Sequence, residues 1–196
     1  MLREKILRSA TLLFANKGFE RVLMDEVAAR AGVGKGSVYR QFSTKEELYT
    51  AMVVEGYIDL RSRIVAELEN AKAAAESMTI IVGQIVSYFW NRLEFFELLR
   101  DPTRLSRTYE NRYRSERQKL VAVVSGAIAQ GAKAGAFCDD LDPHLLAESL
   151  LSMIRGIQRY RRGAVPLSQE EVVQTVVRVF LDGCLRRYHG SIEDGT

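Results

Sequence analysis

Residues 27–42 read Val27-Ala28-Ala29-Arg30-Ala31-Gly32-Val33-Gly34-Lys35-Gly36-Ser37-Val38-Tyr39-Arg40-Gln41-Phe42. This stretch predicts two short helices joined by a tight turn, with Gly32 where the backbone must tolerate a positive φ. Val38 and Phe42 are four residues apart, so they would hold one face of the second helix against a core. The remaining positions then face outward with polar side chains, as in a helix that enters the major groove of DNA.

The segment Lys35-Gly36-Ser37-Val38-Tyr39, then Phe42, then Ser43-Thr44-Lys45-Glu46-Glu47-Leu48, resembles the signature of the TetR family of bacterial transcriptional regulators. The resemblance runs from about Ile6 to about Leu48. It implies an all-α protein with a three-helix helix-turn-helix DNA-binding domain in residues 1–50. Residues 51–196 would then form a helical bundle for ligand binding and dimerisation. Leu23 and Met24 depart from the family, which favours Thr or Ser near the start of the second helix.

The expected DNA contacts lie on and just after the helix at about Lys35–Gln41. Cations there are expected to bind phosphates, which position a protein without specifying sequence: Lys35, Arg40 and Lys45. Base-edge contacts are expected from Ser37, Tyr39 and Gln41, beside Gly36; Gln41 can pair bidentately with adenine, and Tyr39 has a phosphate contact as its alternative. Thr44 and Glu47 predict a capping box for the next helix. Its free N–H groups beside Lys45 suit a phosphate, and the alternative is an ordinary capped helix with a solvated lysine.

Composition fits a packed protein that acts inside the cell. The 196 residues are 47% hydrophobic and carry a formal net charge of +3. Through Thr50, nine Lys and Arg residues face six Asp and Glu residues, so the basic surplus lies in the expected DNA-binding part. Cys138 and Cys184 are far apart and predict reduced thiols, neither a disulfide framework nor a metal site. No apolar run reaches the ~20 residues of a membrane span, so we expect a cytoplasmic protein without a membrane partner.

Helical periodicity continues along the chain. A first helix is expected at about Arg3–Lys17, with a core stripe of Ile6, Ala10, Leu13 and Phe14. A long helix is expected from Lys45 to about Ala73, followed by one at Met78–Leu99 that is apolar nearly all round. Thr103 to Gly135 predicts a short and a longer helix. The last two helices are expected to begin after Asp142 and after Ser168, the second with a Ser168–Glu171 capping box.

An effector site is expected between the helices of residues 51–196. We assign its lining to Met52, Trp90, Phe96, Tyr109 and Met153. The basic and aromatic stretch 104–119 could hold an anionic effector, such as a carboxylate or an acyl-thioester of coenzyme A. The favoured alternative is a solvated face whose charges pair with Glu110 and Glu116.

The two C-terminal helices carry more apolar surface than one internal face can use. A twofold pairing of both helices would bury the excess in a four-helix bundle, so we expect a homodimer, which the family resemblance also implies. Burial of both helices inside a monomer is the alternative. A dimer would set two DNA-binding helices about one turn of duplex apart, or a multiple of it, on a palindrome.

No residue pattern indicates an enzyme, a metal site or a cofactor. His144 and His189 lack a nearby nucleophile or metal partners, and the paired carboxylates stand at helix starts, where the helix dipole explains them. The sequence therefore predicts a DNA-binding transcriptional regulator, chiefly a repressor that a small-molecule effector releases from a palindromic operator. The alternatives are an activator, a repressor without an effector, and a helical interaction protein that no longer reads DNA.

Overall fold

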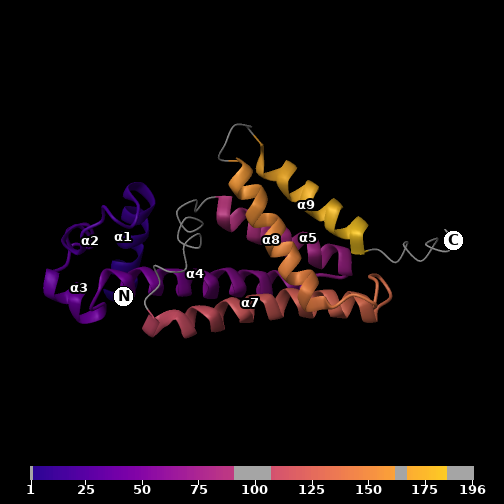
Figure 1. Cartoon of the computed structure of the whole chain (residues 1–196), viewed down its shortest axis with the longest axis horizontal. Helices are drawn as coiled ribbons and strands as arrows, with labels where there is room; N and C mark the ends of the chain where they lie inside the picture. Colours follow the sequence, from indigo (N-terminus) through magenta and orange to yellow (C-terminus); the bar gives the residue numbers. More distant parts are fainter. Residues whose placement is uncertain (1, 91–106, 162–166, 185–196) are drawn as a thin grey trace, which may run out of the picture. The chain divides into compact units, whose positions relative to one another are not determined.

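The computed structural model describes residues 2–90, 107–161 and 167–184, and every regular element in these residues is an α-helix (Figure 1). In chain order the helices are α1 (Leu2–Lys17), α2 (Met24–Ala31), α3 (Lys35–Gln41), α4 (Lys45–Leu68), α5 (Ala74–Trp90), α7 (Arg107–Lys133), α8 (Pro143–Arg161) and α9 (Gln169–Cys184). The predicted all-α class is confirmed. None of the helices in the described part is long and apolar enough to cross a membrane.

The chain forms two compact units, and each unit is built from two separate stretches of the sequence. One unit takes in Met1–Asp59 and Asn91–Gln118, and the other Leu60–Trp90 and Lys119–Thr196. Helices α4 and α7 each contribute residues to both units. The predicted boundary between residues 50 and 51 is a functional division, and it stays a prediction.

The core of the first unit forms where α1 packs on α2 and α2 packs on α3. Ile6, Ala10 and Phe14 of α1 are buried as predicted, whereas Leu13 is only half-buried. Gly18 ends α1 at φ +74°, a conformation that only glycine adopts freely. The chain then turns back, and the Phe19 ring stacks on Phe14 with ring centroids 5.8 Å apart.

Helix α4 begins as predicted but ends earlier. The Thr44 hydroxyl accepts a hydrogen bond from the N–H of Glu47 at 3.0 Å. The Glu47 carboxylate returns to the N–H of Ser43, at 2.7 Å, not to Thr44. The expected continuation to Ala73 is wrong, because α4 stops at Leu68. The N–H groups of Asn70 and Ala71 close a turn there, and Glu76 then accepts from the N–H of Lys72 just before α5.

The second unit is built around α5, which packs against both α8 and α9, while α8 also packs against α9 (Figure 1). Helix α5 starts at Ala74, four residues before the predicted start, and buries Met78, Ile81, Val82, Ile85, Val86 and Tyr88. These residues lie on more than one side of the helix, so the prediction of an apolar helix with two buried sides is confirmed for this part. The predicted extension to Leu99 and the short helix expected from Thr103 lie outside the described residues.

Both C-terminal helices start with the predicted caps. Asp142 accepts hydrogen bonds from the N–H groups of His144 and Leu145, at 2.6 and 3.2 Å, and so caps α8. Ser168 and Glu171 form the predicted capping box of α9: the Ser168 hydroxyl accepts from the N–H of Glu171, and the Glu171 carboxylate accepts from the N–H of Ser168. The capping residues in the sequence were therefore sufficient to predict where α8 and α9 begin.

Candidate nucleic-acid interface

The turn between α2 and α3 depends on one glycine. Gly32 lies in the left-handed region, at φ +61° and ψ +42°. Its N–H donates to the carbonyl of Ala29 at 3.1 Å, and the N–H of Val33 donates to that of Ala28 at 3.0 Å. This pair of bonds is the Schellman motif, which satisfies the last carbonyls of a helix and reverses the chain. Together, α2, this turn and α3 form the α2–α3 motif (Met24–Gln41).

Two apolar side chains set the orientation of α3. Val38 and Phe42 are 0% and 1% exposed, as their spacing predicted. The guanidinium of Arg3 lies 5.3 Å from the centroid of the Phe42 ring, and its Nη1 is 2.8 Å from Glu55 Oε1. A seven-residue helix held through Val38 and Phe42 can turn only one face outward.

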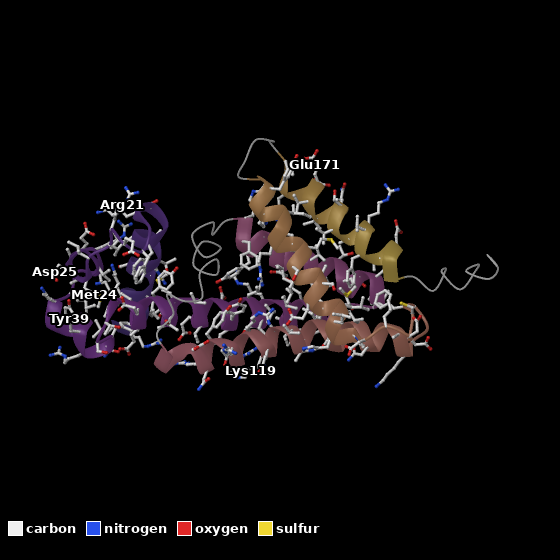
Figure 2. The ribbon with its side chains drawn as sticks, in the orientation of Figure 1. Arg21, Met24, Asp25, Tyr39, Lys119 and Glu171 are labelled. Carbon is white, nitrogen blue, oxygen red and sulfur yellow. The ribbon has the colours of Figure 1, made fainter. Side chains whose placement is uncertain are left out.

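The outward face of α3 carries the side chains predicted to contact DNA. Lys35, Tyr39, Arg40 and Gln41 are exposed, Ser37 is half-exposed, and Gly36 lies among them without a side chain. Figure 2 labels Tyr39 of α3, together with Asp25 and Met24 of α2. The sequence thus placed this face correctly, while the role of each residue on DNA stays a prediction.

The three cations expected at phosphates are held by different acceptors. Arg40 Nη2 donates to the Ser37 hydroxyl at 3.0 Å. Lys45 Nζ donates to the carbonyl of Glu20 at 3.3 Å, and it lies 4.5 Å from the centroid of the Phe19 ring. Both acceptors are neutral, so the two cations keep their full charge for an anionic partner.

Lys35 instead forms an ion pair with α2. Its Nζ lies 2.9 Å from Asp25 Oδ2 and 5.9 Å from the centroid of the Tyr39 ring. The hydrogen bond to the Asp25 carboxylate, and its charge, raise the pKa of Lys35 above the ordinary lysine value. This pair was not predicted, because the partners are ten residues apart and leave no local signal in the sequence.

The start of α2 shows what replaces the Thr or Ser that the family favours. Glu26 accepts a hydrogen bond from the N–H of Leu23 at 3.2 Å, and from Lys17 Nζ at 2.6 Å. The Lys17 hydrogen bond, followed by the Leu23 bond, lowers the pKa of Glu26. Met24 is buried, and Leu23 is 63% exposed. The helix start is therefore capped by a carboxylate.

The residues predicted to line an effector site fall in both units. Met52 is buried in α4, whereas Trp90 of α5 and Met153 of α8 are half-buried. Phe96 and the side chain of Tyr109 lie outside the described residues. Their joint assignment to one site stays a prediction.

Gln158 of α8 was not among the predicted site residues. This side chain is 1% exposed, and neither its amide oxygen nor its amide nitrogen has a hydrogen-bond partner among the residues that the structure describes. A buried amide that makes no hydrogen bond costs about 1–3 kcal/mol, which makes this side chain a candidate for contact with a ligand. The feature of the sequence that could have identified it is its position: Gln158 is a polar residue on the same face of the helix as the apolar residues Ala147, Leu151 and Ile154.

In the basic and aromatic stretch, the described residues support the favoured alternative of paired charges. Arg114 Nη2 lies 2.6 Å from Glu110 Oε1, one helical turn away. The Tyr113 ring packs edge-on against Tyr57, with centroids 5.7 Å apart. Within the described ranges, no group of three or more His, Cys, Asp or Glu side chains could hold a metal ion.

Two family models together match most of the chain. Residues 6–52 match the model described as bacterial regulatory proteins, tetR family, and residues 71–184 match the tetracyclin repressor-like C-terminal domain. The HTH-type transcriptional repressor KstR2 of Mycolicibacterium smegmatis is 26% identical over 188 residues, covering 92% of this chain and 89% of that protein.

Solved structures agree in fold. The TetR family regulator PfmR of Thermus thermophilus superposes with a TM-score of 0.75 at 25% identity, covering 90% of this chain and 97% of that one. FadR of Bacillus subtilis, solved in complex with stearoyl-CoA, reaches a TM-score of 0.81 at 15% identity, covering 92% and 98%. The α2–α3 motif, the all-helical fold and both family models lead to one conclusion: the chain belongs to the TetR family of bacterial transcriptional regulators and binds DNA through its helix-turn-helix.

Proposed function

We propose that this protein is a homodimeric transcriptional repressor that binds a palindromic operator and leaves it when a small molecule binds. The observation that carries the proposal is the orientation of α3. Val38 and Phe42 are fully buried, so Lys35, Tyr39 and Gln41 must face away from the core. A short helix with this outward face fits the major groove of B-DNA.

Each outward residue has a role that follows from its chemistry. Lys35, Arg40 and Lys45 bind phosphates and fix the register of α3 on the duplex. Gln41 and Ser37 reach base edges, with Gln41 able to pair bidentately with adenine, and Tyr39 contacts a base edge or a phosphate. Gly36 lets the backbone of α3 approach the DNA closely.

The homodimer forms through α8 and α9. One stripe along α8 is exposed throughout its length, at Leu145, Ser149, Ser152, Gly156 and Tyr160. Leu145 and Tyr160 are 67% and 63% exposed, and Val179 of α9 is 55% exposed. Large apolar groups at the ends of a stripe of small residues favour close approach of a second copy of the same helix pair.

Release follows if the effector binds better to a state in which the two α3 helices no longer match successive major grooves. A coupling of ~1–3 kcal/mol, typical of such systems, is sufficient for a roughly 5- to 150-fold change in operator affinity. The amide of Gln158, which finds no partner in the described core around α8, supports an effector with a polar group that can both donate and accept. Because it works on DNA, we place the protein in the cytoplasm.

Selection from a random DNA pool tests the proposal. We expect the wild-type protein to enrich a palindrome with half-sites about 10 base pairs apart or a multiple of that distance. Operator affinity should fall steeply as salt rises, because bound cations release counterions from the phosphates. A helical interaction protein would enrich no sequence. A promoter fusion in cells then separates repression from activation by the sign of the change.

A panel of acyl-CoA thioesters, beginning with stearoyl-CoA, is a first screen for the effector. A compound that releases the operator should lose this effect in Gln158→Leu, while operator binding in its absence persists. Gln174→Leu, at an exposed position of α9 where the amide donates to Glu170, is the matched control. If the compound released the operator from both variants equally, Gln158 would not be part of the effector site.

A further inference from the structure

Lys35 differs from the two other cations expected at DNA phosphates. Arg40 and Lys45 rest on a hydroxyl and a backbone carbonyl, neither of which carries a charge. Lys35 rests on the carboxylate of Asp25, whose negative charge, 2.9 Å away, offsets part of its positive charge. Helix α2 therefore removes part of the attraction that α3 would otherwise exert on DNA.

The pair is well placed for exchange with a phosphate. The side chains of Lys35 and Asp25 are 60% and 58% exposed, so water and anions reach both. Exposed ion pairs are weak enough to open at little cost. Figure 2 shows Asp25 on the same outer end of the motif as Tyr39, the aromatic partner of Lys35. A phosphate that binds Lys35 must displace Asp25 or lie beside its negative charge.

We propose that Asp25 sets the DNA affinity of this regulator: its carboxylate competes with operator phosphates for Lys35 and so weakens binding. This inference rests on the proposed function and adds a residue of α2 to it. A moderated affinity has a clear use, because an effector can release an operator only by as much as its own coupling allows. The effect acts at a phosphate contact, so it should be the same for every DNA sequence.

Glu26 provides a matched control on the same helix turn. It is the next residue and is also ion-paired, but its partner is Lys17 of α1, at 2.6 Å. Asp25→Asn and Glu26→Gln each remove one negative charge from α2. The amide oxygen introduced by Glu26→Gln can still accept the hydrogen bond from the N–H of Leu23, so the cap of α2 persists in the control.

The experiment measures binding of two labelled duplexes by fluorescence anisotropy, from low salt to about 0.3 M. One duplex is an operator selected with the wild-type protein, and the other is an unrelated sequence of equal length. We expect Asp25→Asn to tighten binding about 2- to 5-fold per α2–α3 motif, hence about 4- to 25-fold for a dimer, on both duplexes. The salt dependence should steepen by up to about 0.9 per motif. Glu26→Gln should change affinity less than about 2-fold, because its charge is screened at a distance.

A double-mutant cycle separates competition for Lys35 from a general change in charge. In a Lys35→Gln background, Asp25→Asn should have no more effect than Glu26→Gln. Thermal unfolding of each variant shows whether the fold is kept. Equal effects of Asp25→Asn and Glu26→Gln, or weaker binding by Asp25→Asn, would overturn the inference while leaving the proposed function intact. A wild-type protein that binds neither duplex would overturn the proposed function itself.

Discussion

Helices α3 and α8 each bury one face and expose the other, but the exposed faces differ in kind. The seven residues of α3 turn cations, a hydroxyl and an amide outward, over the buried Val38. The nineteen residues of α8 expose small residues between Leu145 and Tyr160. A polar, cationic face suits a polyanion, whereas a face of small residues with large apolar groups at its ends suits another protein surface. The two faces therefore indicate different partners: DNA for α3 and a second copy for α8.

The buried faces differ as well. Val38 and the adjoining Phe42 form a wholly apolar anchor for α3. The buried stripe of α8 includes Gln158, whose amide makes no hydrogen bond within the described part of the chain. An apolar anchor needs nothing more to be stable, whereas a buried amide gains when a ligand satisfies it. Helix α3 thus has a fully apolar anchor, whereas α8 carries an unsatisfied polar group in its buried stripe.

Removing the anchor of α3 should have the largest effect on stability. Phe42→Ala deletes a ring that is 1% exposed and should lower the free energy of unfolding by about 3–5 kcal/mol, measured by denaturant titration. Leu12→Ala, at a position that is 44% exposed, should change it by less than about 0.5 kcal/mol. Equal losses for the two variants would mean that Phe42 is no special anchor.

Blocking the exposed face of α8 should leave each protomer folded and separate the dimer. A Cβ at Gly156 meets no atom of the described chain within 4 Å, and the position is exposed, so we expect Gly156→Arg to extend into solvent and to obstruct a partner. Sedimentation should show monomers, and operator affinity should fall about 100-fold or more because two linked sites no longer act together. Gly126→Arg, at an equally open and exposed position of α7, should remain dimeric. A dimeric Gly156→Arg would move the interface elsewhere.

Two glycines of the α2–α3 motif should respond in opposite ways. Gly32→Ala forces a side chain into the left-handed region, at φ +61°, and should cost about 1–2 kcal/mol of stability. Gly36→Ala lies in a helix with open space around it and should add about 0.5–1 kcal/mol. We nevertheless expect Gly36→Ala to weaken operator binding, because the new methyl group faces the DNA. Stability loss in both, without a binding defect in Gly36→Ala, would contradict the roles given to them.

The smallest effects concern the carboxylates at the starts of α2 and α9. Hydrogen bonds lower the pKa of Glu26, chiefly from Lys17, and that of Glu171, chiefly from the N–H of Ser168. Because the pKa of each carboxyl group is lower in the folded protein than in the unfolded chain, its ionised form stabilises the fold at pH values above the ordinary pKa of 4.5. This stabilisation is lost as pH falls through the pKa of the folded state. The stability advantage of wild type over Glu171→Gln should thus be present at neutral pH and decline as pH falls below the ordinary value of 4.5. Added salt should reduce the stability advantage of wild type over Glu26→Gln more than that over Glu171→Gln, because of the two carboxylates only Glu26 is paired with a charge. A stability advantage that does not change with pH would contradict this account.

Local patterns in the sequence were enough for much of the fold. Gly32, Val38 and Phe42 predicted both the turn and the orientation of α3, and Ser168 with Glu171 predicted the start of α9. Each of these signals acts over a few residues of backbone. The predicted end of α4 at Ala73 was wrong because helical propensity alone does not show where a turn such as that at Asn70 closes.

The details of the site were harder to predict. The pairs Lys35–Asp25 and Lys45–Glu20 join residues that are 10 and 25 positions apart. The first pair depends on how α2 packs against α3, and the second on how α4 lies against the turn after α1, which no local pattern specifies. The amide of Gln158 could be placed on a helix face from sequence, but whether it finds a partner is a property of the packed core.

Methylation interference tests the central claim, that α3 of each protomer occupies the major groove. Dimethyl sulfate marks the guanine N7 in the major groove and the adenine N3 in the minor groove. On the selected operator, guanine N7 methylation should block binding in two stretches related by a dyad, about 10 base pairs apart or a multiple of that distance. Interference at adenine N3 alone, or in a single stretch without its dyad mate, would contradict the account.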